Sequence, residues 1–384
     1  MEQWDAIAPS VAMLKTGSSV MSARLPNLLS DYLRHVPNLL VVSNLSAPPP
    51  EPGRPAVLDV LHGPAAQAIA EVDVNAVAMA TRALVEQAQA SAPPLPSPPL
   101  PSPPPEAEVG WDADRRKNIP TYVATWARFP GRDWYIMVDD DTWVNLPNLA
   151  ALLAPLNASE PLYLGNPYVL SGRGCAGLRL GAVLFAHGGS GIILSRAAVE
   201  LLVPQAPTCM REFGECWAGD GMLGLCLHSI GILPRHGDGL CGDSPFDLFK
   251  PDARGCPPHD PPPEHCVAPR PVTYHRIRER WQVAMLAEHE TLQRRSPVSL
   301  RDFLYRRMWW WRLRRSRRPL NTTRRCNLKL ENERERVYST NRPDRLLEYC
   351  SSRGLEVGCM ARLTRRLPPS RTDGRPGTVY AIEY

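Results

Sequence analysis

Three consecutive carboxylates, Asp139, Asp140 and Asp141, directly follow an aromatic and β-branched run from Trp134 to Val138. A short apolar run bounded by charge is typical of a buried parallel strand. Because adjacent carboxylates at the end of such a strand repel one another and lose hydration, they favour a bound cation. Mg²⁺ and Mn²⁺ take oxygen ligands, and open α/β sheets bind ligands at the carboxyl ends of their strands. The triplet therefore indicates a divalent metal that holds a phosphorylated substrate, with a solvated acidic turn as the alternative.

A second segment that could contact a ligand is the glycine-rich run of His187, Gly188, Gly189, Ser190 and Gly191. Three glycines in four positions let a backbone turn sharply or approach a ligand closely. The run is not a P-loop, because no lysine follows at the required spacing. Since glycine-rich turns are common, this segment alone is a weak signal.

Two single residues, Asp220 and His275, complete the candidate set. Asp220 stands between Gly219 and Gly221 at the start of a predicted helix, where a general base would have a free approach path. A helix N-cap is the alternative role for this aspartate. His275 lies at the end of a predicted strand, and its imidazole is an acceptable ligand for Mn²⁺. A single histidine is nevertheless more often a surface or packing residue.

Alternating strands and helices must position these groups. A strand over 11–14, a helix over 20–35 and a strand over 38–44 form a parallel βαβ unit. Residues 47–56 and 237–269 are expected to be loops. The remaining expected elements are an Ala-rich helix over 64–90, a helix over 115–127, the central strand 134–138, a helix over 146–154, a strand over 163–165, a hairpin across 170–185, a helix over 196–203 capped by Ser195, a helix within 216–228, a last strand over 272–277 and a helix over 281–293.

The 384-residue chain is predicted to hold an α/β catalytic region, a Pro-rich insertion and a basic tail. Nine of the thirteen residues over 93–105 are Pro, a composition typical of polyproline II or disorder. The predicted bounds are 1–90 for the N-terminal part of the nucleotide-binding region, 91–107 for the insertion, 108–280 for the rest of the catalytic region and 281–384 for the tail.

The net charge of +5 hides an asymmetry. Residues 1–269 hold 17 Lys and Arg against 27 Asp and Glu, whereas residues 270–384 hold 27 against 12. Nine Arg and three adjacent Trp lie within 306–325, a mixture that would suit nucleic acid or an anionic membrane surface. A solvated or disordered basic face is the alternative, because no recognised nucleic-acid module accompanies this segment.

Seven of the ten cysteines lie within 175–266. Their spacings match neither a zinc knuckle nor a thioredoxin-type pair, so an even count in a loop-rich region indicates disulfides of a secretory compartment. Reduced buried thiols are the alternative. Sequons at Asn44, Asn157 and Asn321 permit N-glycosylation. The sequence has no visible signal peptide and no apolar stretch of roughly 18 residues, so membrane association is expected only through an anchor absent from this chain.

In their order along the chain, these motifs resemble the fringe-like β-1,3-glycosyltransferases, grouped as glycosyltransferase family 31. The triplet with the following Thr142 is similar to the family's DxD-type motif, and segment 185–191 is similar to its Gly-Gly-Ala-Gly loop. Asp220, with Gly224 four residues on, resembles the family's acidic-Asp-x-x-x-Gly element, and His275 resembles its histidine near the end of the catalytic domain. The opening run Leu14-Lys15-Thr16-Gly17 is also similar to fringe-type members.

The resemblance covers about residues 10–278. It departs from the family pattern at Gly219, where many relatives carry an acidic residue, and at Ser190, which replaces Ala. It implies an α/β fold of the GT-A type, which is a Rossmann-like, mostly parallel sheet flanked by helices. It also implies a UDP-sugar donor, a glycan or glycoprotein acceptor and a location in the Golgi lumen.

The resemblance further implies roles for single residues. Asp141 and His275 would hold Mn²⁺ or Mg²⁺, while Asp139 and Asp140 would lie near the nucleotide ribose and the metal-bound waters. The His187–Gly191 loop would line the donor or acceptor pocket. Asp220 would deprotonate the acceptor hydroxyl, which attacks the anomeric carbon with inversion.

Three functions follow as hypotheses. The first is an inverting, metal-dependent enzyme that moves a hexose or N-acetylhexosamine from a UDP-sugar to a glycan hydroxyl, in β-1,3 linkage. The second is a relative that binds a sugar nucleotide or glycan without turnover. The third is a nucleic-acid-binding protein that acts through the Arg- and Trp-rich tail, although nucleic acid is not the expected partner.

Overall fold

The computed structural model describes residues 9–29, 33, 36, 38–47, 55–71, 110–170, 175, 183–248, 266, 270–293, 300 and 303–304. The chain divides into two compact units, of which the larger comprises Met1–Leu248 and Pro262–Ser296. The helices and strands named below belong to this unit. The predicted Pro-rich insertion at 91–107 and the tail beyond residue 304 lie outside the described residues.

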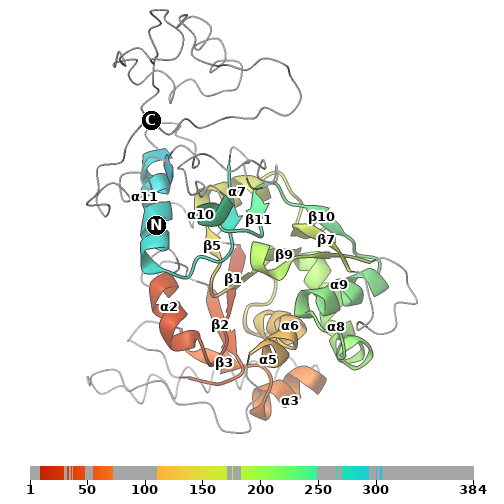
Figure 1. Ribbon diagram of the computed structural model, residues 1–384. Helices are drawn as coiled ribbons and strands as arrows, with labels where there is room; N and C mark the ends of the chain where they lie inside the picture. Colours follow the sequence, from red (N-terminus) through yellow and green to blue (C-terminus); the bar gives the residue numbers. More distant parts are fainter. Residues whose placement is uncertain are drawn as a thin grey trace, which may run out of the picture. The chain divides into compact units, whose positions relative to one another are not determined.

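A seven-stranded sheet in the order β10-β6-β9-β4-β1-β2-β3 forms the centre of the larger unit (Figure 1). Strands β4, β1, β2 and β3 are parallel neighbours and β10 is parallel to β6, whereas β9 is antiparallel to β4 and β6. The predicted α/β class with a mostly parallel sheet is therefore confirmed. The strands are β1 (Ser10–Lys15), β2 (Leu39–Ser43), β3 (Val57–Asp59), β4 (Trp134–Asp139), β6 (Tyr163–Gly165), β9 (Ile192–Ser195) and β10 (Pro234–His236).

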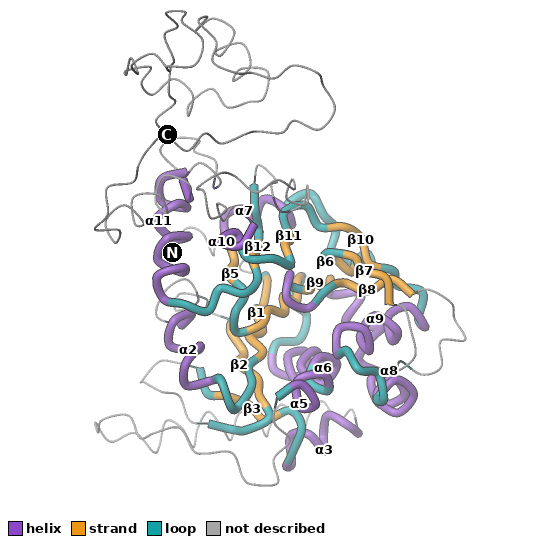
Figure 2. The backbone as a smooth tube through the Cα atoms, in the orientation of Figure 1, coloured by secondary structure: helices purple, strands orange, loops and turns teal. Residues whose placement is uncertain are grey.

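Helices lie on both sides of this sheet (Figure 2). In β4, Tyr135 and Met137 join the core cluster under α6, α8 and α9, while Ile136 and Val138 are buried on the opposite side, because successive strand residues face opposite ways. Burial on both faces explains the continuous apolar run of this strand. The helices are α2 (Met21–Leu29), α3 (Gly63–Glu71), α5 (Trp111–Arg115), α6 (Asn118–Arg128), α7 (Leu146–Leu153), α8 (Arg196–Phe213), α9 (Gly219–Ser229), α10 (Pro245–Leu248) and α11 (Arg280–Gln293).

Two small sheets complete the unit. Strand β7 (Pro167–Leu170) pairs antiparallel with β8 (Val183–Ala186), which confirms the pairing predicted across 170–185. Strand β12 (Thr273–Tyr274) lies between β11 (Leu240–Cys241) and β5 (Trp143–Val144). Because Tyr274 pairs with Trp143, this sheet brings the next residue, His275, beside the acidic triplet.

Several predicted bounds are wrong. The last strand covers two residues rather than 272–277, and the predicted loop 237–269 contains β11 and α10. The helix predicted over 115–127 exists as α6, but it begins at Asn118, and Arg115 instead ends the separate helix α5. The helix predicted over 196–203 continues to Phe213 through two prolines, because its apolar residues stay buried at helical spacing and this packing outweighs proline's cost.

Strands β3 and β10 were not predicted from the sequence. Each has three residues and lies at an edge of the sheet, too short to show the alternation that identifies a strand. Among the described residues, no helix combines the length and apolarity needed to cross a membrane.

Candidate active site

The acidic triplet stands where β4 ends and turns toward β5. Asp139 is the last residue of β4, and the carbonyl of Asp139 accepts a hydrogen bond from the Thr142 amide at 3.0 Å. The Thr142 hydroxyl donates to the Gly189 carbonyl at 2.9 Å, which ties the turn to the glycine-rich loop. The acidic triplet therefore follows a strand, as predicted, and it adjoins the glycine-rich loop.

The three carboxylates have different partners. Asp140 accepts hydrogen bonds from the Thr16 hydroxyl and from Nη1 of Arg24, both at 2.6 Å. Asp141 contacts Nε2 of His275 at 3.1 Å and Nε of Arg278 at 2.9 Å. The N-terminal βαβ unit therefore holds Asp140, whereas residues after β12 make the shorter contacts to Asp141, from which Nη1 of Arg24 is 3.7 Å away.

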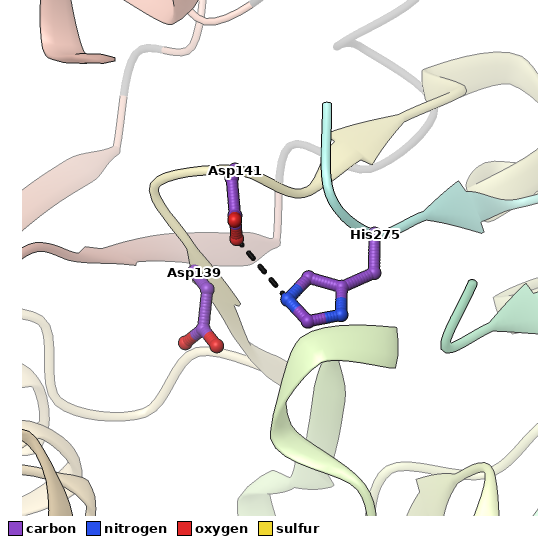
Figure 3. Close-up of side chains that lie close together, drawn as sticks. All are labelled: Asp139, Asp141 and His275. Carbon is purple, nitrogen blue, oxygen red and sulfur yellow. Dashed lines mark ion pairs between the residues drawn. The ribbon is translucent and has the colours of Figure 1, made fainter. Parts of the chain in front are cut away.

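Asp139, Asp141 and His275 form one group that suits a metal ion (Figure 3). One ligand atom from each lies within 4.8 Å of the others. Two carboxylate oxygens and one imidazole nitrogen are a donor set that Mn²⁺ accepts, and carboxylates also suit Mg²⁺. The structure brings together the predicted metal ligands Asp141 and His275, and it adds Asp139, whose predicted position was near the nucleotide.

Burial and neighbouring charges give the members of this group different protonation behaviour. Burial raises the pKa of Asp139 to about 6, reinforced by the nearby carboxylates and opposed by Lys15. Burial would also raise the pKa of Asp141, but hydrogen bonds from His275 and Arg278 hold that pKa well below its usual range. Burial disfavours charge on His275, yet the bond to Asp141 raises its pKa. Asp141 is therefore the most readily ionised ligand of the group.

A buried lysine connects the triplet to helix α5. Lys15 is 5% exposed, and its ammonium contacts Asp114 at 2.7 Å and Asp139 at 3.2 Å. Although burial disfavours its charge, Asp114 and Asp139 raise the pKa of Lys15 above its ordinary value. Lys117 contacts Asp114 at 3.6 Å and donates to the Thr16 carbonyl at 2.7 Å.

Sequence reasoning assigned no role to these buried residues. The signal that could have found Lys15 is its place at the end of β1, because the parallel register pairs it with Asp139. Asp114 and Lys117 lie in an ordinary mixed-charge segment, and nothing in their spacing distinguishes them from solvated residues.

The glycine-rich loop separates the metal-suited group from Asp220. A Cβ on Gly189 would lie 2.3 Å from Cε1 of His275, so the absence of a side chain lets the loop pack on the imidazole. The adjacent Gly188 amide donates to Oδ2 of Asp220 at 2.7 Å. Two consecutive loop residues therefore contact His275 and Asp220.

Asp220 is the second residue of α9, and Ala218 occupies the N-cap position. The N-cap alternative is therefore wrong for this aspartate. Its two carboxylate oxygens accept from the amides of Gly188 and Gly221, at 2.7 and 2.9 Å. Amide donors fix the orientation of the carboxylate without an opposing side-chain charge.

His187, the first residue of the loop, lies between two rings. Its ring centroid is 5.1 Å from that of Tyr168 and 5.6 Å from that of His275. Burial lowers the pKa of His187, and its buried Nδ1 has no hydrogen-bond partner among the described residues. This neutral imidazole beside the metal-suited group fits the predicted contact with a polar ligand, which stays a prediction.

Three disulfides fix the segments around the loop and α9. They join Cys175 to Cys216, Cys209 to Cys226, and Cys241 to Cys266. The described cysteines are thus all oxidised, as the secretory interpretation predicts, and the reduced-thiol alternative is wrong for them.

Comparison with known proteins identifies part of this architecture. A family model described as fringe-like matches residues 113–240, which include the triplet, the glycine-rich loop and Asp220. The chain is 30% identical over 143 residues to a β-1,3-glucosyltransferase of Mus musculus, a segment that covers 37% of this chain and 25% of the mouse protein. It is also 30% identical over 129 residues to the β-1,3-N-acetylglucosaminyltransferase radical fringe of Notophthalmus viridescens, covering 28% of this chain and 32% of that protein.

Among solved structures, a glycosyltransferase involved in glycosylation of the major capsid of PBCV-1 matches 73% of this chain and 99% of that chain. The identity is 12% and the TM-score is 0.30. The matched segment spans only about a quarter of the length of the mouse relative.

Proposed function

Because residues 113–240 form a fringe-like domain related to β-1,3-glycosyltransferases, we propose that this chain is an inverting, metal-dependent glycosyltransferase. It moves a hexose or N-acetylhexosamine from a UDP-sugar to a hydroxyl of a glycan or glycoprotein acceptor, in β-1,3 linkage. The observation that carries this proposal is the loop contact: Gly189 packs on His275 of the metal-suited group, while Gly188 holds Asp220.

In this proposal Asp139, Asp141 and His275 hold Mn²⁺ or Mg²⁺. When bound there, the cation supplies positive charge that stabilises the leaving diphosphate. Asp140 positions the metal ligands: it accepts hydrogen bonds from Thr16 and Arg24, and these bonds fix the turn that carries Asp139 and Asp141. The loop from His187 to Gly191 lines the donor or acceptor pocket.

Asp220 acts as the general base. Its carboxylate accepts the proton of the acceptor hydroxyl while the acceptor oxygen forms a bond to the anomeric carbon of the sugar. The bond from that carbon to the diphosphate oxygen breaks on the opposite side, so UDP leaves and the configuration inverts. The Gly188 and Gly221 amides keep the carboxylate oriented toward the incoming hydroxyl.

No described feature favours the alternative of a relative without turnover. One departure from the family pattern is Gly219, where many relatives carry an acidic residue. In this chain a Cβ at that position would lie 2.5 Å from the Arg115 carbonyl oxygen, so close packing of α5 on α9 accounts for the glycine. The nucleic-acid hypothesis rests on residues 306–325, which lie outside the described residues.

The proposed location is the Golgi lumen. Three disulfides are typical of an oxidising secretory compartment. Of the sequons, Asn157 is exposed and is the proposed glycosylation site, whereas Asn44 is buried and its amide donates to the Ser18 hydroxyl. Asn321 lies outside the described residues.

UDP release in the presence of Mn²⁺, measured across a panel of UDP-sugars and simple glycoside acceptors, tests the proposal. We expect one donor to give turnover that falls about 10²–10⁴-fold in Asp220→Asn. The variant should keep the rise in melting temperature that UDP and Mn²⁺ give to the wild type, since the metal-suited group is intact. Full turnover in Asp220→Asn would refute the role of the base.

A further inference from the structure

Two exposed tryptophans, one in α5 and one just before α9, are joined by a hydrogen bond from a ring to a backbone carbonyl. Trp111, the first residue of α5, is 60% exposed, and Trp217, just before α9, is 50% exposed. The indole Nε1 of Trp111 donates to the Trp217 carbonyl at 2.7 Å. This bond satisfies the only polar atom of the Trp111 ring, and because the residue is 60% exposed, much of its apolar surface is open to solvent.

The pair is held rigidly. Arg115, on the same helix as Trp111, donates to the carbonyls of Gly214 and Cys216, at 2.7 and 3.3 Å. Cys216, the residue before Trp217, is bonded to Cys175. The close approach of the Arg115 backbone to Gly219 completes the contact between α5 and α9. Rigid, exposed aromatic rings can bind a ligand with little loss of conformational freedom.

The two tryptophans lie on segments that lead to both parts of the candidate active site, namely Asp220 and the metal-suited group. Trp217 lies three residues before Asp220 in the chain. Trp111 and Asp114 are three residues apart on α5 and therefore share a face of that helix. Asp114 in turn contacts Lys15, whose ammonium reaches Asp139. The two tryptophans therefore lie on segments that also carry Asp114, which contacts Lys15, and Asp220, the proposed base.

We propose that Trp111 and Trp217 bind the acceptor sugar by stacking on a face of its ring, an inference that rests on the proposed glycosyltransferase activity. The C–H bonds on one face of a hexose make that face apolar, and the negative face of an indole attracts these polarised hydrogens. The exposed carboxylate of Asp112, next to Trp111 and 3.5 Å from Nε of Arg115, accepts hydrogen bonds from the sugar hydroxyls at the edge of the stack. An apolar face bordered by a charged acceptor matches a sugar better than a lipid.

Binding of four methyl glycosides, those of β-glucose, β-galactose, β-N-acetylglucosamine and β-N-acetylgalactosamine, tests the assignment. Saturation-transfer NMR measures the Kd of each, with and without UDP and Mn²⁺. We expect at least one sugar to bind the wild type, and its Kd to rise about tenfold in Trp111→Ala and in Trp217→Ala. Trp281→Ala is the matched control, because Trp281 is also 50% exposed but packs on Phe246.

Trp111→Phe guards against a folding defect, since it keeps an aromatic face while it removes the indole donor and one of the two fused rings; it should retain sugar binding. Equal Kd values in the wild type and both alanine variants, or no binding of any of the four sugars, would overturn the assignment. The melting-temperature rise with UDP and Mn²⁺ is recorded for every variant. If the wild type shows no such rise, the proposed activity is contradicted. If all variants show the rise and the alanine variants bind sugar as the wild type does, only the tryptophan site is overturned.

Discussion

The two sides of the glycine-rich loop are built differently. On one side, the acidic triplet is surrounded by cationic side chains from distant segments: Lys15, Arg24, His275 and Arg278. On the other side, backbone amides hold Asp220, and disulfides and a close helix contact fix the segments around it. The first side balances charge against charge, whereas the second orients a carboxylate with backbone donors.

This difference matches the two tasks that we propose. The charge around a group that holds a divalent cation and a diphosphate changes as these ligands enter and leave, and cationic side chains beside the carboxylates can balance that change. A general base must be free to accept a proton, and a cationic partner would occupy its carboxylate and make it less basic, so amide donors suit it better than an ion pair. Changes on the two sides of the loop should therefore have separable effects.

The largest expected effect comes from removing a ligand of the metal-suited group. Asp141→Asn deletes the carboxylate that His275 and Arg278 contact. The rate of UDP release from the sugar donor in the presence of Mn²⁺ should therefore fall by about 100-fold or more. Mn²⁺ should also cease to increase the melting temperature in the presence of UDP. Differential scanning fluorimetry with and without EDTA measures this.

Asp220→Asn is the counterpart on the other side of the loop. It should lose turnover and keep the metal-dependent stabilisation. If both variants lost turnover and stabilisation together, the two sides would be one coupled unit and the comparison would fail.

The second effect concerns folding stability. Lys15→Met leaves Asp114 and Asp139 without their shared buried cation, which should lower the free energy of unfolding by about 3–5 kcal/mol. Urea denaturation followed by circular dichroism measures the change. The matched control is Arg196→Met, which breaks a partly exposed ion pair with Asp133 at 3.6 Å and should cost at most about 1 kcal/mol. Equal losses in the two variants would show that Lys15 does not hold the triplet.

These contrasts also explain what the sequence could predict. The β4 run and the triplet were predictable because apolar residues and charges adjoin in the chain, so one local pattern carries both strand and site. The approach of His275 to Asp141 could be expected only from family resemblance, since it depends on β12 pairing with β5 across more than a hundred residues. The Lys15–Asp114 contact and the Trp111–Trp217 hydrogen bond had no local signature, because the first joins β1 to α5 and the second joins α5 to the segment before α9.

The third effect concerns the covalent bonds on the Asp220 side. Replacing Cys209 and Cys226 together by Ala removes a disulfide between residues 17 positions apart that joins α8 to α9. The loss of this cross-link should lower the free energy of unfolding by about 3 kcal/mol, measured by urea denaturation. The native protein should still be stabilised by UDP and Mn²⁺, because the metal-suited group lies outside these helices. Loss of that stabilisation in the folded variant would contradict the separation of the two sides.

The smallest and most local contrast uses the two neighbouring glycines of the loop. A Cβ in Gly189→Ala would lie 2.3 Å from the His275 ring, so the imidazole must shift and the apparent affinity for Mn²⁺ should fall by about tenfold. In Gly188→Ala the new Cβ would lie 3.4 Å from Oδ2 of Asp220, a tight contact that should lower turnover while Mn²⁺ affinity stays near that of the wild type. Both variants keep the backbone amide, so they differ chiefly in which side of the loop gains a methyl group. Titration of Mn²⁺ against UDP-dependent stabilisation, together with turnover at saturating Mn²⁺, separates the two. If both variants lost the same amount of Mn²⁺ affinity, the loop would shift as one body. The glycine-rich loop would then not separate the metal-suited group from Asp220.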